Sequence, residues 1–351
     1  YTGSTTVSAG VLKLGAAGSG TNTPLGTTVS GTTVASGATL DLNGYTLATA
    51  EALTLNGIGV SGGGALTNSS ATPATYSGLI TLGSHSSIVS YGDIVLSNTG
   101  TITGSGFGLT LGGDSRPCEP SCTGLERSTL ASIIGTGTGT LTKQDAGVWQ
   151  ISGSNTYTGN TTILSGTMRL LSNDVLPDGS TLVVVGGSLH QGGYADTVHG
   201  VQLIGGGISH GTLTSVTDFD VRSGAINSVL VGASSSVGLN KTTAGTVWLY
   251  KANTYTGTTT VSLGDLAIAS SERLADGSTL VVNGGRFSMV SGVETVAGVR
   301  LTSGSIINGT LTSNTDFDLQ AGTVSAVLAG ASSSVGLRKT TAGSVTLSGA
   351  N

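Results

Sequence analysis

The chain has 351 residues, of which 59 are Gly and only 5 are Pro, and charged residues make up 9% of it. Because 37% of the residues are hydrophobic, the composition excludes a disordered chain, and Gly without a three-residue period excludes collagen. The net charge of -5 is spread thinly, without a basic stripe, so we expect no nucleic-acid partner. No apolar run reaches the roughly 18 residues of a membrane-spanning helix, so we expect no direct membrane span in this segment.

Residues 1–134 consist of short strand-like runs that are interrupted by Gly, Asn and Ser. Apolar residues occupy alternate positions in these runs, as at Leu40 and Leu42 or at Leu53 and Leu55. That alternation is typical of a strand with one buried face. We expect these runs to form the N-terminal turns of a β structure.

The alternation stops at residues 113–131, which hold two prolines and a cluster of charge around Cys118 and Cys122. We expect a small loop that protrudes from the fold. Two cysteines four positions apart, with a proline between them, indicate a disulfide formed outside the cytosol. The alternative is half of a metal site, which the lack of a second Cys or His pair nearby disfavours.

From residue 135 the sequence becomes repetitive. Residues 135–154 begin a signature, residues 155–252 form a first repeat of 98 residues, and residues 253–350 form a second repeat that aligns with the first without gaps. The signature reads SGSNTYTGNTTILSGTMRL in the first repeat and KANTYTGTTTVSLGDLAI in the second, and the chain opens on YTGSTTVSAGVLKL. The signature positions are Tyr1, Gly3, Asn155, Tyr157, Gly159, Asn253, Tyr255, Gly257 and Asn351.

A period of this length is too long for one supersecondary unit and corresponds to four or five turns of a solenoid, at roughly 20 to 25 residues a turn. Strands this short bury one face only when each stacks on the equivalent strand of the next turn, which also satisfies the backbone hydrogen bonds. We therefore predict an all-β fold, a parallel β-helix (β-solenoid) that is continuous over residues 1–351. The general crossover preference predicts that it is right-handed.

The copies of the signature also predict which side chains point inward. Positions that are apolar in every copy, such as Trp149 and its equivalent Val247, should lie inside, whereas variable positions such as Trp248 should face solvent. The pattern therefore predicts a buried Trp149 and an exposed Trp248. The other predicted inward positions are Val345, Ile151, Leu249, Leu347, Val7, Ile163, Val261, Leu12, Met168, Leu266, Leu14, Leu170 and Ile268, and the other outward positions are Gln150, Thr346, Ser152, Tyr250 and Ser348.

Two acidic pairs, Asp218 with Asp220 and Asp316 with Asp318, occur in equivalent TDFD segments of the two repeats. Paired carboxylates are what glycoside hydrolysis needs. Their duplication together with the scaffold instead favours acids that cap loops by accepting backbone hydrogen bonds. The histidines show no metal-ligand spacing. We therefore expect no catalytic residue, no cofactor and no metal site.

The segments around Asn155 and Asn253 and the opening residues resemble the autotransporter-associated β-strand repeat of bacterial surface proteins. The Leu-x-Lys runs that begin at positions 141, 239 and 337 match that repeat too, and residues 37–83 look like the segments that accompany it. The resemblance implies a right-handed parallel β-helix in a secreted passenger or a large adhesin. It also implies a location outside the cell or at the bacterial cell surface.

These features favour a non-catalytic structural or adhesive rod segment of a surface protein or an extracellular filament. The last residues, SGAN, and the first, YTGSTTVSAG, are two halves of one signature, so we expect neighbouring copies or segments of the same protein to stack end to end. One alternative is a polysaccharide-acting enzyme on the same scaffold. Another is a glycan-binding module in which Trp248 and Tyr250 stack on a sugar of a host or environmental surface glycan.

Overall fold

The computed structural model describes residues 1–18, 20–114 and 127–350, so Cys118, Cys122 and Asn351 lie outside the described residues. It divides into two compact units. The first unit holds residues 1–180 and 186–194, and the second holds residues 181–185 and the chain from Ala195 onward. Strands dominate both units, and among the described residues no helix is long and apolar enough to cross a membrane.

The first unit is built from short strands and contains one 3-10 turn, η1 (Val60–Gly62). Its strands are β1 (Thr5–Val7), β2 (Gly10–Lys13), β3 (Asn22–Thr23), β4 (Gly26–Thr27), β5 (Thr32–Val34), β6 (Ala38–Asp41), β7 (Thr46–Leu47), β8 (Leu53–Gly57), β9 (Leu66–Asn68), β10 (Ala74–Tyr76), β11 (Ile80–Ser90), β12 (Ile94–Leu96), β13 (Thr101–Thr103), β14 (Leu109–Gly112), β15 (Ser128–Leu130), β16 (Ile133–Gly135), β17 (Leu141–Lys143), β18 (Val148–Ile151), β19 (Thr161–Ile163), β20 (Thr167–Leu170) and β22 (Ser188–His190).

The second unit consists of strands of similar length, with a few longer ones that bend round a corner. They are β21 (Thr181–Val184), β23 (Ala195–Val198), β24 (Gly200–Leu203), β25 (Gly207–Ser215), β26 (Phe219–Val221), β27 (Gly224–Gly232), β28 (Leu239–Lys241), β29 (Thr246–Leu249), β30 (Thr259–Val261), β31 (Asp265–Ile268), β32 (Thr279–Met289), β33 (Val293–Val296), β34 (Gly298–Ile307), β35 (Thr310–Ser313), β36 (Phe317–Leu319), β37 (Gly322–Val324), β38 (Val327–Gly330), β39 (Leu337–Arg338) and β40 (Val345–Leu347).

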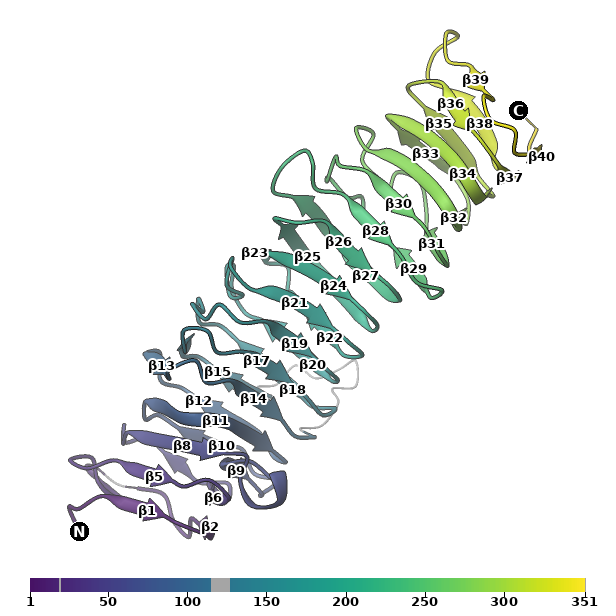
Figure 1. Ribbon diagram of the computed structural model, residues 1–351. Coiled ribbons are helices and arrows are strands. Elements are labelled where there is room, and N and C mark those ends of the chain that lie inside the picture. The colour runs from purple at the N-terminus through teal and green to yellow at the C-terminus, as the bar shows by residue number, and fades with distance from the viewer. Residues whose placement is uncertain (19, 115–126, 351) are drawn as a thin grey trace. The chain divides into compact units, whose positions relative to one another are not determined.

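Each unit is a parallel β-solenoid, in which strands pair with the strand one coil further along, apart from β3 and β4 of the first unit, which form an antiparallel pair. In the second unit Leu239 pairs with Thr259, and Thr259 pairs with Leu280. The ladder continues through β34 and β36 to β39, so five coil steps cover the 98 residues from position 239 to position 337. The stacked strands can be followed in Figure 1. The predicted four or five turns per repeat are therefore five.

Each coil of the second unit has three sides that surround one core. The first side stacks β28 on β30 and β32, and the second stacks β29 on β31 and the far half of β32. The third side stacks β33 on β35 and β38. Side chains alternate between buried and half-buried along these strands, as in the pattern of β29, because successive residues of a strand point to opposite faces.

The inward and outward assignment is confirmed at its central positions. Trp149 and Val247 are both fully buried, as is Leu249. Trp248 lies between the two buried residues of β29 and is half-buried, and Tyr250, which follows that strand, is 43% exposed. In the two tryptophans, the same residue type therefore occupies opposite faces of the solenoid wall.

Three predicted inward positions are not buried: Leu12 is 36% exposed, Leu347 is 44% exposed, and Val345 is half-buried. Leu12 lies on β2, which pairs with β6, and Leu347 lies on β40, which pairs with β37. Among the described strands, each of these has a neighbour on one flank only. An inward side chain in such a coil is covered from one direction and stays open from the other.

The predicted loop over residues 113–131 is too long at its C-terminal end. Ser128–Leu130 forms β15, which pairs with β12 and with β18 inside the first unit. Leu130 is fully buried there, so the alternating pattern resumes before the loop was predicted to end. The predicted disulfide between Cys118 and Cys122 lies outside the described residues. The handedness and the continuity of one β-helix over the whole chain stay predictions.

Candidate functional site

The signature Asn is a bridge between three successive coils. Asn253 Oδ1 accepts a hydrogen bond from the Leu230 backbone N–H at 2.8 Å, and Asn253 Nδ2 donates to the Arg273 carbonyl at 2.8 Å. Asn155 forms the equivalent bonds at 2.7 and 2.8 Å. Both side chains are buried. The signature segment is not a strand, and the Asn amide adds to the backbone hydrogen bonds that Asn253 and Thr254 donate to the coils on either side.

The signature Tyr fills the core beside this bridge. Tyr255 is 1% exposed, and its hydroxyl lies 2.9 Å from Thr259 Oγ1. Its ring lies 5.8 Å from that of Phe219 in the neighbouring coil. Tyr157 is fully buried and makes the same hydroxyl contact with Thr161, at 2.6 Å. A buried Tyr needs such a partner for its hydroxyl, and the Thr two positions beyond the signature Gly supplies it.

The signature Gly lets two coils touch backbone to backbone. A Cβ on Gly257 would lie 2.4 Å from the Val237 carbonyl oxygen, and one on Gly159 would lie 2.4 Å from the Gly139 oxygen. At the equivalent Gly3 nothing lies within 4 Å. The glycine is therefore required only where another coil packs against the corner.

The Lys of two of the three Leu-x-Lys runs turns back into the solenoid, whereas Lys339 of the third run is exposed. Lys241 is fully buried, and its Nζ donates to the Leu263 carbonyl at 2.9 Å and to the Thr243 carbonyl. Lys143 is also fully buried, and burial lowers its pKa to about 8, against the opposing effect of Asp145. The run is recognisable in the sequence as part of the repeat, but nothing in its pattern indicates that its cation is buried.

The acids of the TDFD segments already have partners within the fold. Asp218 Oδ1 and Asp316 Oδ1 each accept a backbone N–H of the following coil at 2.8 Å, from Gly238 and Gly336 respectively. The Gly336 N–H, and then Arg338, hold the pKa of the Asp316 carboxyl below its usual value. A general acid for glycoside hydrolysis needs a raised pKa. These contacts are those of loop-capping acids.

The second acid of each pair forms an ion pair instead. Asp220 lies 2.8 Å from Arg222, and Asp318 lies 3.2 Å from Arg300. Over residues 1–18, 20–114 and 127–350, no group of three or more His, Cys, Asp or Glu side chains is placed to hold a metal ion.

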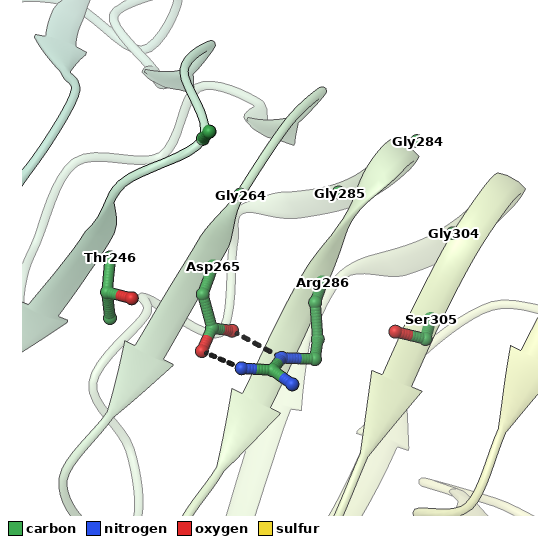
Figure 2. Close-up of a pocket in the computed structure, with 9 residues that line it drawn as sticks. Thr246, Gly264, Asp265, Gly284, Gly285, Arg286, Gly304 and Ser305 are labelled. Carbon is green, nitrogen blue, oxygen red and sulfur yellow. Dashed lines mark hydrogen bonds and ion pairs between the residues drawn. The ribbon is translucent and has the colours of Figure 1, made fainter.

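A row of polar side chains crosses the outer surface of the second unit. Register places Thr246 beside Asp265, Asp265 beside Arg286, and Arg286 beside Ser305. Arg286 forms two parallel hydrogen bonds to Asp265, Nε to Oδ1 at 3.0 Å and Nη2 to Oδ2 at 2.6 Å, as Figure 2 shows. The Asp265 hydrogen bonds raise the pKa of Arg286 above its ordinary value. We call these four residues the polar row.

The polar row lines a pocket of about 330 Å³. Its remaining lining consists of Ala244 and of glycines at the corners of successive coils, Gly264, Gly284, Gly285 and Gly304. Because these glycines carry no side chain, the coil corners beside the polar row do not fill the pocket. The pocket is therefore a depression with an ion pair on its wall.

Two aromatic side chains extend this surface along β29. Trp248 and Tyr250 have ring centroids 6.2 Å apart and planes inclined by 26°. Trp248 is two residues from Thr246 and so points to the same face of the strand. Register places Ala225 on one side of Trp248 and Ala267 on the other. The predicted sugar-stacking residues are thus brought together, beside a polar pocket that the sequence did not predict.

The side chains of this surface are not repeated one period earlier in the chain. Ninety-eight positions earlier, Trp248 and Tyr250 are replaced by Gln150 and Ser152. In the same comparison Thr167 stands for Asp265, and Ser188 stands for Arg286. The divergence was visible in the sequence, but the step of 21 residues that places Asp265 beside Arg286 was not.

These observations define a parallel β-solenoid with a period of five coils and a buried signature. Residues 1–14, 141–170 and 239–268 match the family model described as Passenger-associated-transport-repeat. These are the signature segments, so the predicted resemblance is confirmed.

Among curated proteins, the chain is similar to the adhesin BmaC autotransporter of Brucella suis biovar 1 (strain 1330). The two are 30% identical over 250 residues, which is 64% of this chain and 7% of that protein. No solved structure matches the chain.

Proposed function

We propose that this chain is a non-catalytic structural and adhesive segment of a bacterial surface protein, exposed outside the cell. The observation that carries the proposal is that the repeated residues hold neighbouring coils together. The signature Asn, Tyr and Gly and the Lys of the Leu-x-Lys run all contact neighbouring coils, as at Asn253 and Lys241. A repeat used in this way builds length and leaves the outer side chains free to vary, which suits a passenger that presents a surface.

The comparisons support this function at a coarser level. The family model concerns passengers, and the similar protein from Brucella suis is named an adhesin. We extend adhesion to this chain as part of the proposal. The partners that the acids of the TDFD segments already have support the non-catalytic part, because a hydrolase needs a free acid and base at a cleft.

The test is adhesion by the purified segment, coupled to beads and applied to cultured epithelial cells, extracellular matrix and polysaccharide-coated wells. We expect saturable attachment above the level of beads that carry the same segment after heat unfolding. Release of reducing sugar from the polysaccharides should stay at the background of buffer alone. Sugar release that disappears on Asp218→Asn or Asp316→Asn would overturn the proposal in favour of the enzyme.

We also propose that neighbouring segments or copies stack on the last described coil. Leu337 and Leu347 are 46% and 44% exposed there, although the equivalent Leu239 and Leu249 are fully buried under the next coil. A pocket of about 380 Å³ lies between them. A further coil with the same pattern would cover this apolar row and pair its open strand edge.

Sedimentation velocity and negative-stain imaging of the segment test the stacking. We expect concentration-dependent assembly that Leu337→Glu with Leu347→Glu abolishes, because a charge there has no partner in a stacked coil. A wild-type segment that remains a monomer at the highest soluble concentration would contradict the stacking of copies.

A further inference from the structure

We propose that the outer face of β29, β31 and β32 in the second unit is a binding site for an uncharged glycan. The inference rests on the proposed adhesive function and names the chemical class of its ligand. The site combines Trp248 and Tyr250 with three members of the polar row, Thr246, Asp265 and Arg286, which lie on the same face of neighbouring strands.

The aromatic part offers a stacking surface at the edge of the pocket. Trp248 and Tyr250 are nearly parallel, and their centroids are 6.2 Å apart. The C–H groups on one face of a pyranose ring carry a partial positive charge, and the face of an aromatic ring carries the negative part of its quadrupole. The neighbours of Trp248 in its row are Ala225 and Ala267, whose side chains are too short to occupy the space of a sugar ring.

The polar part offers donors and acceptors for hydroxyl groups. The Arg286 guanidinium has five N–H groups and uses two on Asp265, so three remain. The Arg286 side chain is 51% exposed and the Asp265 side chain 13%. Because Asp265 holds the guanidinium in a bidentate pair, its free N–H groups point in a fixed direction. The Thr246 hydroxyl beside them adds a group that both donates and accepts.

The two parts form one continuous surface. Thr246 lines the pocket and is two residues from Trp248 on the same strand face. Ala267 follows Asp265 at the same spacing, so it lies on the same face of the strand, and it is 1% exposed. Ser288 stands next to Ala267 in register and is 9% exposed. A sugar stacked on Trp248 would therefore have its next residue over the polar pocket.

The charge balance identifies the ligand as uncharged. Asp265 and Arg286 neutralise each other, so the pocket offers no net charge to a sulfate, a uronic acid or a phosphate. The chain as a whole is sparsely charged. A protein partner would need an interface of about 1,200 Å² or more, whereas here two rings and one pocket are concentrated on three strands. Neutral oligosaccharides match that size and that mixture of apolar faces and hydroxyls.

The test is calorimetric titration of the 351-residue segment with neutral hexasaccharides: β-1,4-glucan, β-1,3-glucan, β-1,4-xylan and α-mannan. Alginate and hyaluronan fragments serve as charged probes. We expect at least one neutral probe to bind, and the charged probes to bind no more tightly than that. Binding of the charged probes alone, or of no glycan at all, would overturn the inference.

The equivalent positions one period earlier provide matched variants. Trp248→Gln with Tyr250→Ser, and separately Asp265→Thr with Arg286→Ser, install the residues that stand 98 positions earlier in the chain. We expect each pair to weaken neutral-glycan binding by about tenfold or more, with an unchanged circular-dichroism melting curve. Gln150→Ala with Ser188→Ala is the control and should leave binding unchanged. Unaltered affinity in both matched pairs would refute the site.

The same variants separate this inference from the proposed function. If wild-type beads attach to cells but no glycan binds, the glycan site is wrong and the adhesive segment stands. If the beads fail to attach anywhere while a neutral glycan binds in solution, adhesion is wrong and the site stands.

Discussion

In this protein, single side chains form hydrogen bonds between neighbouring coils at places where no strand is present. Where the signature passes, the third side of a coil has no strand, and side chains add to the few backbone hydrogen bonds there. Asn253 bridges Leu230 and Arg273, and Glu294 on β33 accepts the N–H groups of Arg273 and Leu274 at 2.8 and 2.7 Å from the opposite direction. The Arg273 carbonyl also accepts the Asn253 backbone N–H at 3.1 Å, whereas the Leu230 N–H depends on the Asn253 side chain.

Replacing Asn253 by Ala should lower the urea midpoint clearly. The change leaves the buried Leu230 N–H without its side-chain partner, at a cost of about 1–3 kcal/mol, while the Arg273 carbonyl keeps the backbone N–H of residue 253. Asn240→Ala is the control, because the Asn240 amide bonds to Asp218 at an exposed position. A midpoint for Asn253→Ala equal to that of the control would contradict the bridge.

Glu294 makes the stability depend on pH. Burial raises its pKa to about 7, against the lowering effect of its backbone hydrogen bonds. The folded chain therefore keeps this proton at pH values where the unfolded chain, with a pKa near 4.5, has released it. The resulting stabilisation is fully present below pH about 4.5 and is lost as the pH rises through about 7.

We therefore expect the melting temperature of the wild type, relative to that of Glu294→Gln, to fall between pH 5 and pH 8. Thermal unfolding of both proteins across that range measures the difference. A difference that rises with pH would mean that the two backbone N–H groups outweigh burial, and this part of the account would be wrong.

At the scale of elements, the sequence predicted the strands, the repeat and the two faces well. Three copies with the same alternation are enough to distinguish an inward Trp149 from an outward Trp248, because buried positions hold apolar residues in every copy and outward positions vary between polar and aromatic residues. The partners of Asn253 and of Asp265 could not be predicted. They depend on which residues lie one coil apart, a step of about 20 residues. The sequence repeats visibly only every 98 residues, so the positions of the five shorter steps within that period cannot be read from it.

The corner glycine gives a prediction at this scale. Gly257→Ala should destabilise the fold by about 1–3 kcal/mol or more, because its Cβ would lie 2.4 Å from backbone atoms that cannot move freely. Gly3→Ala should leave the urea midpoint unchanged, since nothing lies within 4 Å of its Cβ. Equal effects of the two substitutions would show that the glycine serves flexibility and not close packing.

At the scale of the molecule, stability comes from each coil packing against its neighbours. Equivalent residues should therefore differ in importance according to whether a coil covers them. Leu249→Ala should cost about 2–5 kcal/mol, because Leu249 is fully buried. Leu347→Ala should cost much less in the isolated segment, where this equivalent side chain is 44% exposed. Urea unfolding of both variants makes the comparison, and a larger loss at Leu347 would contradict neighbour-by-neighbour stacking.

The alternating wall of stacked coils can be tested most directly by the fluorescence of its two tryptophans. Trp248→Phe leaves Trp149, whose Nε1 donates to the buried Gly112 carbonyl at 3.0 Å, and Trp149→Phe leaves Trp248 on the outer face. We predict blue-shifted emission shielded from acrylamide for the chain that retains Trp149, and red-shifted, readily quenched emission for the chain that retains Trp248. The reverse result, a quenchable Trp149 and a shielded Trp248, would contradict the account.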